Sequence, residues 1–421
     1  MAVSHRRGNA AYVIGVVSGA HFLSHLFLLA FPPLFPLLAR DFGLSTTRLG
    51  LLITAIYVPT LLFQLPIGDV IDRIGARHVL VTGITVTALG ITLAGFAPNY
   101  PLLLACAFLS GVGQSVFHPA DYALLDTVTD SSTEGTAFSI HTFGGYAGFA
   151  VAPLVIGSLA LTISWEIALI AVGLVGFGYA GVVHLTVEAV HTQAIQTRKS
   201  DDIESSSNAD ESVRETIGEL VTFARRFKML LVFSFYLLSM MAVVGLQSFT
   251  TVLAVDAYGF DESTANTLLT VHLTATAVGV LAGGPLADRL PFRHVLTTMF
   301  LSAALGVWIL VATGVPSLLV TGVLLSVIGL LIGLSLPSRD KFATVVADPG
   351  TAGKSFGFFF TGLSMGAVIS PVLLGTVIDR FSPPVAFLLV GGFLVAGVVV
   401  VIVARVTGVG HPVKQSTQAN D

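Results

Sequence analysis

Twelve apolar segments, each long enough to cross a lipid bilayer, constrain the fold of this chain more than any other feature. A membrane-spanning helix needs about 20 predominantly apolar residues. Only 10% of the 421 residues are charged, whereas a soluble domain carries about 25%. The sequence therefore predicts an all-α integral membrane protein with 12 transmembrane helices. The predicted helices cover residues 11–38, 49–68, 79–97, 101–122, 136–159, 165–187, 228–254, 265–287, 295–313, 317–338, 355–376 and 385–406.

The positive charges are distributed unevenly over the loops between these segments. With the N-terminus on the cytoplasmic side, 17 of the 20 Lys and Arg residues fall in cytoplasmic segments, and only Arg40, Arg48 and Arg380 fall outside. Cytoplasmic loops of membrane proteins carry an excess of Lys and Arg. We therefore expect a multi-pass protein of the cytoplasmic membrane with both termini in the cytoplasm. The net charge of −4 argues against nucleic acid as a partner.

A short charged motif occurs twice, after the second and after the eighth apolar segment. Both copies follow the pattern G-x-x-x-D-R-x-x-x-R, and they start 216 residues apart. The motif residues are Gly68, Asp72, Arg73, Gly75 and Arg77 in the first copy and Gly284, Asp288, Arg289 and Arg293 in the second. A carboxylate at a helix junction can hold a helix N-terminus or an Arg of the facing half, so we interpret both copies as a gate. The alternative is a solvated turn that follows the excess of positive charge on cytoplasmic loops.

Other residues also repeat along the chain. Eight Gly, Phe and Pro residues of the first half recur 218 positions later, among them Pro153, which matches Pro371. The chain therefore has two homologous halves, and such a protein can transport by tilting one half against the other. The expected organisation is an N-terminal six-helix bundle at 1–187, a cytoplasmic linker at 188–227, a C-terminal six-helix bundle at 228–406 and a cytoplasmic tail at 407–421.

Together these features resemble the major facilitator superfamily over nearly the whole chain. The resemblance rests on the two motif copies, the Gly- and Pro-rich fifth helix and the 6+6 layout with a long middle loop. Residues 117–120, Phe-His-Pro-Ala, resemble a segment of the fosmidomycin-resistance-type efflux branch. Two positions depart from the family motif: Ala76 replaces a basic residue, and Pro291 replaces the second glycine of the C-terminal copy. The resemblance implies two pseudo-symmetric six-helix bundles around a central cavity, lined mainly by helices one, four, seven and ten.

Asp121 lies inside the fourth apolar segment, where an ionisable group costs about 2.5–3.5 kcal/mol on insertion scales. Gln114, His118 and Asp121 recur at steps of three and four residues, which places them on one helix face. Asp121 and His118 are therefore candidates for taking up and releasing a proton during transport. The alternative places Asp121 at the cytoplasmic end of its helix, paired with Arg73 or Arg77 as part of the gate.

Further polar residues interrupt the apolar segments and are candidates to line a substrate cavity. They are His21, His25, Gln114, His141, Gln247, His272 and Arg339. His21 and His25 have the i, i+4 spacing that can also bind a metal, but no third Glu or Cys lies nearby, so we expect no metal site. Arg339 is the repeat counterpart of Asp121. It either pairs with Asp121, attracts an anionic substrate, or is an ordinary positive charge of a cytoplasmic loop.

The sequence predicts a secondary active transporter and not an enzyme. Residues 350–355 match only the end of a phosphate-binding loop, so we expect an ion gradient as the energy source, and no cofactor. The leading hypothesis is an antiporter for proton-coupled efflux of a small organic molecule by alternating access. The alternatives are proton-coupled uptake of a small organic anion and, from another class, a non-transporting membrane sensor or a channel. The expected partners are a small-molecule substrate, protons and the lipid bilayer, and the expected state is a monomer.

Overall fold

The computed structural model describes residues 2–64, 66–130, 133–187, 218, 222–312, 314, 317–347 and 352–409. Within these residues nearly every element is a helix, no strand occurs, and 12 segments are long and apolar enough to cross a membrane. The prediction of an all-α protein with 12 transmembrane helices is thereby confirmed. Most of the expected linker at 188–227, and the expected tail beyond residue 409, lie outside the described residues.

The first six spans are built from nine α-helices and one short 3₁₀ helix. These are α1 (Ala2–Leu28), η1 (Pro32–Leu34), α2 (Phe35–Phe42), α3 (Thr46–Phe63), α4 (Ile67–Ile74), α5 (Ala76–Ala94), α6 (Tyr100–Gln114), α7 (Phe117–Val128), α8 (Glu134–Thr162) and α9 (Trp165–Thr186). Three spans predicted as continuous helices are interrupted. The first breaks before Pro32 and Pro33, the second breaks because α3 ends at Phe63 and α4 begins at Ile67, and the fourth breaks between α6 and α7. In an unbroken fourth helix the ring of Pro119 would collide with the carbonyl group of Ser115.

The last six spans are built from six α-helices and one π-helical turn. These are α12 (Phe227–Val252), η2 (Leu253–Ala257), α13 (Glu262–Arg289), α14 (Phe292–Ala312), α15 (Leu318–Val346), α16 (Ala352–Arg380) and α17 (Pro383–Val406). Side chains cap two of these helices at the start. Asp261 accepts a hydrogen bond from the N–H of Thr264 in α13, and Ser317 accepts one from the N–H of Val320 in α15. Such caps satisfy N–H groups that have no partner inside the helix.

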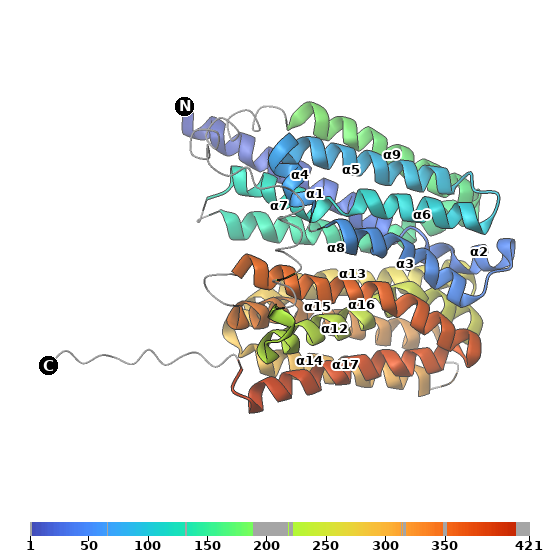
Figure 1. The fold of residues 1–421 in the computed structure, drawn as a ribbon. Helices are drawn as coiled ribbons and strands as arrows, with labels where there is room; N and C mark the ends of the chain where they lie inside the picture. Colours follow the sequence, from blue (N-terminus) through green and yellow to red (C-terminus); the bar gives the residue numbers. More distant parts are fainter. Residues whose placement is uncertain are drawn as a thin grey trace.

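The helices form two groups, α1 to α9 and α12 to α17, that lie side by side (Figure 1). The start of α1 and the end of α17 lie at the same end of the molecule, which we call the termini side. The helix α2 lies at the opposite end, which we call the far side (Figure 1). The two groups contact each other mainly through α3 with α16 and through α8 with α13.

Glycines bring α3 and α16 into close contact toward the far side. A Cβ atom added to Gly50 of α3 would lie 2.2 Å from the carbonyl oxygen of Pro371 in α16. A Cβ atom added to Gly375 of α16 would lie 2.6 Å from the carbonyl oxygen of Thr46 in α3. Small residues allow membrane helices to approach this closely. The far-side contact between the two halves therefore depends on glycine at both positions.

Candidate functional site

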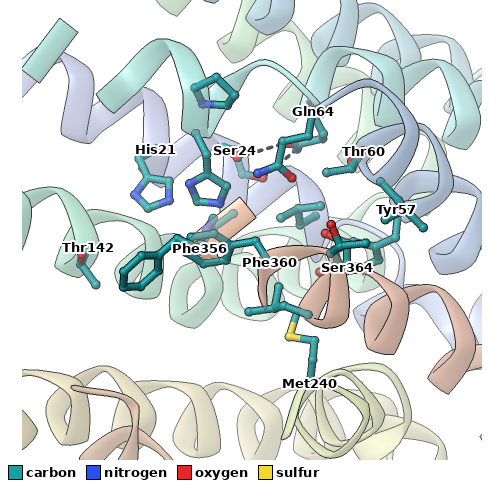
Figure 2. A pocket seen from close by; sticks show the side chains of 18 of the residues that line it. His21, Ser24, Tyr57, Thr60, Gln64, Thr142, Met240, Phe356, Phe360 and Ser364 are labelled. Carbon is teal, nitrogen blue, oxygen red and sulfur yellow. Dashed lines mark hydrogen bonds between the residues drawn. The ribbon is translucent and has the colours of Figure 1, made fainter. Parts of the chain in front are cut away.

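A cavity of about 550 Å³ lies between the two groups of helices. Its walls come from α1, α3, α4, α6, α7 and α8 in the first group and from α12, α15 and α16 in the second. Figure 2 shows this cavity at close range, with His21 on one side and Met240 on the other. The first, fourth, seventh and tenth spans all contribute, but α3, α8 and α16 line the cavity as well, so the expectation that those four spans would be its main walls is only partly met. Sites for small molecules have volumes of about 300–1,000 Å³, so the cavity can hold one.

Hydrogen bonds between α3 and α16 close the cavity toward the far side. The Asp379 carboxylate accepts hydrogen bonds from the N–H groups of Thr46 at 2.7 Å and Thr47 at 2.8 Å, and from the Thr47 hydroxyl at 2.6 Å. We call this contact of Asp379 with Thr46 and Thr47 the far-side clasp. The Thr54 hydroxyl donates to the carbonyl oxygen of Val368 at 2.7 Å. An acidic side chain of one half thus caps the N-terminus of a helix in the other half.

The break between α1 and α2 adds a second closure. The other half forms hydrogen bonds with two carbonyl groups at this break. The Thr251 hydroxyl of α12 donates to the carbonyl oxygen of Pro32 at 2.9 Å. The Asn266 side chain of α13 donates to the carbonyl oxygen of Pro33 at 3.3 Å. The interrupted first span therefore joins the two halves on the far side.

The cavity opens toward the termini side. Gly68 at the start of α4, Gly353 at the start of α16 and Asp340 near the end of α15 all line it there. The Asp340 side chain is 51% exposed. A solute can therefore reach the cavity from the termini side, while the far-side clasp blocks the other route.

Four histidines of the first half lie together beside the cavity. His21 and His25 come from α1, His118 from α7 and His141 from α8. The ring of His21 stacks on that of His141 at 3.9 Å between centroids, and its centroid lies 4.3 Å from that of His25. His21, His25 and His118 line the cavity, but His141 does not. The sequence predicted His141 as a cavity residue, and the structure instead buries it completely behind the wall, because its ring packs on His21.

Asp121 of α7 is fully buried next to this cluster. Its Oδ2 lies 3.8 Å from Nε2 of His141. Arg77, one of the two cations expected as a gate partner for Asp121, instead donates a hydrogen bond to the carbonyl oxygen of His184 at the end of α9. The other cation, Arg73, lies exposed on α4. The pairing of Asp121 with the gate is therefore not found in this conformation, because α7 turns the carboxylate toward α8.

Gln114 and Ser24 join α6 to α1 at the cavity wall. The Ser24 hydroxyl donates to Oε1 of Gln114 at 2.8 Å, and the Gln114 amide donates to the carbonyl oxygen of Ser24 at 2.9 Å. Both residues line the cavity, as does Gln247 from α12. Gln114 and Gln247 were predicted from the sequence as cavity residues, but Ser24 was not. The position of Ser24 beside His25, on a helix predicted to line the cavity, was the available signal.

Arg339 lines the cavity from the second half, at the position equivalent to Asp121. Its Nε donates to Oδ1 of Asp340 at 2.9 Å, and the same carboxylate oxygen accepts from the Tyr236 hydroxyl at 2.9 Å. The guanidinium carbon lies 4.9 Å from the centroid of the Tyr236 ring. The expected partner, Asp121, is thus replaced by the neighbour of Arg339 in the sequence. A charged Arg-Asp dipeptide within an apolar span was the signal that could have identified Asp340.

His272 of α13 lies away from the cavity wall. It is 3% exposed, and its Nδ1 lies 3.0 Å from the carbonyl oxygen of Leu325 in α15. The sequence predicted His272 as a cavity residue. The structure makes it a contact within the second half instead, because no described residue of α13 lines the cavity.

The last Arg of each motif copy binds within its own half. Arg77 donates to the carbonyl oxygen of His184, and Arg293 donates to that of Val409 at 2.6 Å. Each contact joins the motif to the end of the last span in that half. Gly75 joins α4 to α5 with a φ of +89°, a conformation that favours glycine. This explains one glycine of the motif by backbone geometry alone.

The Asp-Arg pairs of the motif lie in helix ends rather than in loops. Asp72 and Arg73 belong to the last turn of α4, and Asp288 and Arg289 to the last turn of α13. All four are exposed. Gly68, the first residue of the motif, lines the cavity on its open side. The gate role of these residues remains a prediction.

Comparisons with known proteins agree with this architecture. A family model described as Major Facilitator Superfamily matches residues 17–265 and 229–420. The chain is 28% identical over 384 residues to the uncharacterized MFS-type transporter YfnC of Bacillus subtilis (strain 168), with 88% of each protein covered. It is 25% identical over 377 residues to the fosmidomycin resistance protein of Escherichia coli (strain K12), with 88% of this chain and 87% of that protein covered.

A solved structure shows the same fold. It is that of a bacterial homologue of the human lysosomal transporter Spinster, in an inward-facing and occupied conformation. The TM-score is 0.76 at 15% sequence identity, with 94% of this chain and 97% of that chain covered. At this identity the likeness concerns the fold alone.

Proposed function

This chain belongs to the Major Facilitator Superfamily, and from that premise we propose that it is a secondary active transporter that exports a small organic molecule in exchange for protons. One observation carries the proposal: a cavity of about 550 Å³, walled by both halves, is closed at one end and open at the other. Transporters built from two repeats place their substrate between the halves and alternate its access by tilting them. Each bundle, 1–187 and 228–406, acts as one body, with 188–227 as the linker.

The location of the termini defines the direction that the cavity faces. The excess of Lys and Arg supports cytoplasmic termini, so the described state is open to the cytoplasm. The far-side clasp then stabilises this inward-open state. We assign the Asp72–Arg73 and Asp288–Arg289 ends of α4 and α13 to the opposite state, in which the cavity is closed at the termini side.

A buried carboxylate and its imidazole neighbours support proton coupling. Asp121 is fully buried and lies 3.8 Å from Nε2 of His141, and His118, three residues earlier on α7, lines the cavity. An ionisable residue inside a span marks a functional site by default. In this proposal Asp121 carries the proton, and His118 connects it to the cavity. The similarity to a protein named for fosmidomycin resistance favours export.

The polar lining of the cavity supports a substrate with an anionic group. His21, His25, Gln114 and Gln247 offer hydrogen bonds on its wall. Arg339 offers planar donors that suit a carboxylate or phosphonate. The Arg339 side chain is 14% exposed, so it is accessible yet largely desolvated. We therefore propose that a monomer binds a small organic anion beside Arg339.

Transport into proteoliposomes tests this function. Radiolabelled fosmidomycin, and a panel of small carboxylates, should accumulate when the lumen is more acidic than the medium, because protons leave as the substrate enters. Accumulation driven by the opposite gradient would support uptake with protons instead. Flux without saturation or trans-acceleration would indicate a channel, and binding without flux a sensor. A lack of flux for every compound of the panel under both gradients would contradict the proposal.

A further inference from the structure

Three histidines from separate helices bring their ring nitrogens together. His21 comes from α1, His118 from α7 and His141 from α8. One nitrogen of each ring can be chosen so that all three lie within 4.8 Å of one another. The sequence offered only His21 and His25 as neighbours on one helix, which is why it predicted no metal site.

Four of the six ring nitrogens of these three histidines have no hydrogen-bond partner in the described protein. Nε2 of His21, Nδ1 of His118 and both ring nitrogens of His141 are buried without a hydrogen-bond partner in the described protein. A buried polar atom left in this state costs about 1–3 kcal/mol. Such atoms are rare in folded proteins, and each requires an explanation. Several unpartnered nitrogens in one cluster indicate a binding site for a ligand.

Neighbouring groups orient two of the three rings. Nδ1 of His21 donates a proton to the carbonyl oxygen of His141 at 2.8 Å, which leaves Nε2 of His21 with a free lone pair. Nε2 of His141 lies 3.8 Å from Oδ2 of Asp121, which leaves Nδ1 of His141 free. Metal-binding histidines commonly use their second nitrogen in this way, toward a backbone carbonyl or a carboxylate.

We propose that His21, His118 and His141 bind one divalent transition-metal cation, of which Zn²⁺ is the type, with Asp121 positioning His141. Imidazole nitrogen suits Zn²⁺ and Ni²⁺, whereas Mg²⁺ and Ca²⁺ require oxygen ligands. Coordination at about 2.0–2.1 Å places tetrahedral ligand nitrogens about 3.4 Å apart, so the outermost nitrogens must approach by up to about 1.4 Å, and the stacked rings of His21 and His141 must rotate out of their parallel arrangement.

The site is accessible from the substrate cavity. His21 and His118 belong to the cavity wall, so the cation can enter from the open side. A divalent charge there lies on the wall of the first half, opposite Arg339 in the second. Ligation uses deprotonated nitrogens, so metal binding and protonation of these rings exclude each other. The site does not depend on the proposed transport activity.

Titration with Co²⁺, a coloured substitute for Zn²⁺, tests the site. The full chain, purified in detergent without a polyhistidine tag and treated with a chelator, should bind one Co²⁺ with the intense visible absorption of a tetrahedral site. Zn²⁺ should abolish this absorption by displacement. His118→Gln and His141→Gln should each weaken binding at least tenfold. His272→Gln is the matched control: His272 is also buried against a backbone carbonyl, but it lies in the other half, and its loss should leave binding unchanged.

A His118→Cys variant separates ligation from a structural role. A thiolate at this position should retain Co²⁺ and add a sulfur-to-metal charge-transfer band in the near ultraviolet, which only a direct ligand produces. Absence of stoichiometric binding by the unaltered protein would overturn the proposal. Binding that survives both glutamine substitutions unchanged would overturn it as well. Fosmidomycin flux measured on the same preparation distinguishes failure of this site from failure of the proposed transport.

Discussion

Asp121 and Arg339 occupy equivalent positions in the two halves but have different partners. Arg339 pairs with Asp340 at 2.9 Å, whereas Asp121 lies 3.8 Å from Nε2 of His141. A guanidinium retains its proton at every physiological pH, whereas a carboxyl group can gain or lose one. At the residue scale, the first half therefore holds a charge that can change, and the second half holds one that does not. This division suits a carrier that couples protons to an anionic substrate.

Replacing Asp121 tests whether its carboxyl group takes up the proton that drives transport. In Asp121→Asn we expect substrate exchange between two neutral compartments to continue, while accumulation driven by a pH gradient falls to the background of empty liposomes. The reason is that an amide cannot take up the proton. Flux assays with labelled substrate under both conditions measure this. Asp126→Asn, on the exposed side of the same helix, should behave as the unaltered protein. Uphill transport by Asp121→Asn would remove Asp121 from the coupling mechanism.

At the scale of elements, helix ends make the contacts that would distinguish the two states of the proposed transport cycle. Asp379 at the end of α16 satisfies two N–H groups at the start of α3, across the boundary between the halves. Ser45 is the N-cap of α3 within the chain, so Asp379 is a second cap supplied by the other half. Its hydrogen bonds break when the far side opens. The clasp therefore stabilises only the state that is closed there.

Removing the clasp should shift the conformational equilibrium. Loss of a capping side chain costs about 0.5–2 kcal/mol, and about 1 kcal/mol changes a population ratio about fivefold. We expect Asp379→Ala to raise the far-side-open population by about that factor. Pulsed electron paramagnetic resonance can measure this as a longer distance between spin labels at Phe96→Cys and Leu319→Cys, both exposed, with Cys106 replaced by Ser.

Asp261 provides the control for this experiment. Hydrogen bonds from the N–H and hydroxyl of Thr264 lower the pKa of its carboxyl group, but Thr264 belongs to the same helix start and the same half. Asp261→Ala should therefore leave the distance distribution unchanged. Equal shifts in both variants would show that loss of a cap anywhere, rather than loss of the clasp, changes the equilibrium.

The proposed gate role of the motif at the end of α4 is also a property of a helix end. If Asp72 stabilises the state closed at the termini side, Asp72→Asn should lower the turnover rate about tenfold, which corresponds to about 1.4 kcal/mol. Substrate affinity measured by equilibrium binding should change little, because Asp72 does not line the cavity. Asp69→Asn, also exposed on α4, should turn over normally. Normal turnover in Asp72→Asn would exclude the gate role.

At the scale of the whole molecule, the two halves touch at one end and part at the other. Glycines at positions 50 and 375 and the far-side clasp join them on one side, while the cavity separates them on the other. A rigid tilt of the halves about the cavity would separate them on the far side and join them on the termini side. Proteins built from repeated halves support this motion. The charges in the two ends of the molecule decide which end faces the cytoplasm.

Labelling with a membrane-impermeant maleimide tests that orientation. Cys106, the one cysteine of the chain, is 4% exposed and should give little background. Arg73→Cys and Arg289→Cys should react only after cells are permeabilised, because both lie on the termini side. Arg380→Cys, exposed on the far side, should react in intact cells. Reaction of Arg73→Cys and Arg289→Cys from opposite sides of the membrane would contradict the duplicated architecture on which the proposed function depends.

The sequence alone was sufficient to predict the number of spans, the all-helical fold and the family. A bilayer leaves backbone groups no partners except those within a helix or a closed barrel, so apolar segments of sufficient length nearly dictate the secondary structure. Helical periodicity also placed Gln114 and His118 on one face, and the structure has both of them on the cavity wall. These are properties of residues close together in the chain.

Only the tertiary structure decided which polar groups meet. His141 lies 20 positions from Asp121 along the chain and on another helix, Asp379 caps Thr46 from the opposite half, and His272 turns away from the cavity. Such contacts depend on the rotation and crossing of whole helices, which are set by the packing of many side chains rather than by any local pattern. The hydrophobic pattern therefore determined the elements, and the packing between them determined the site.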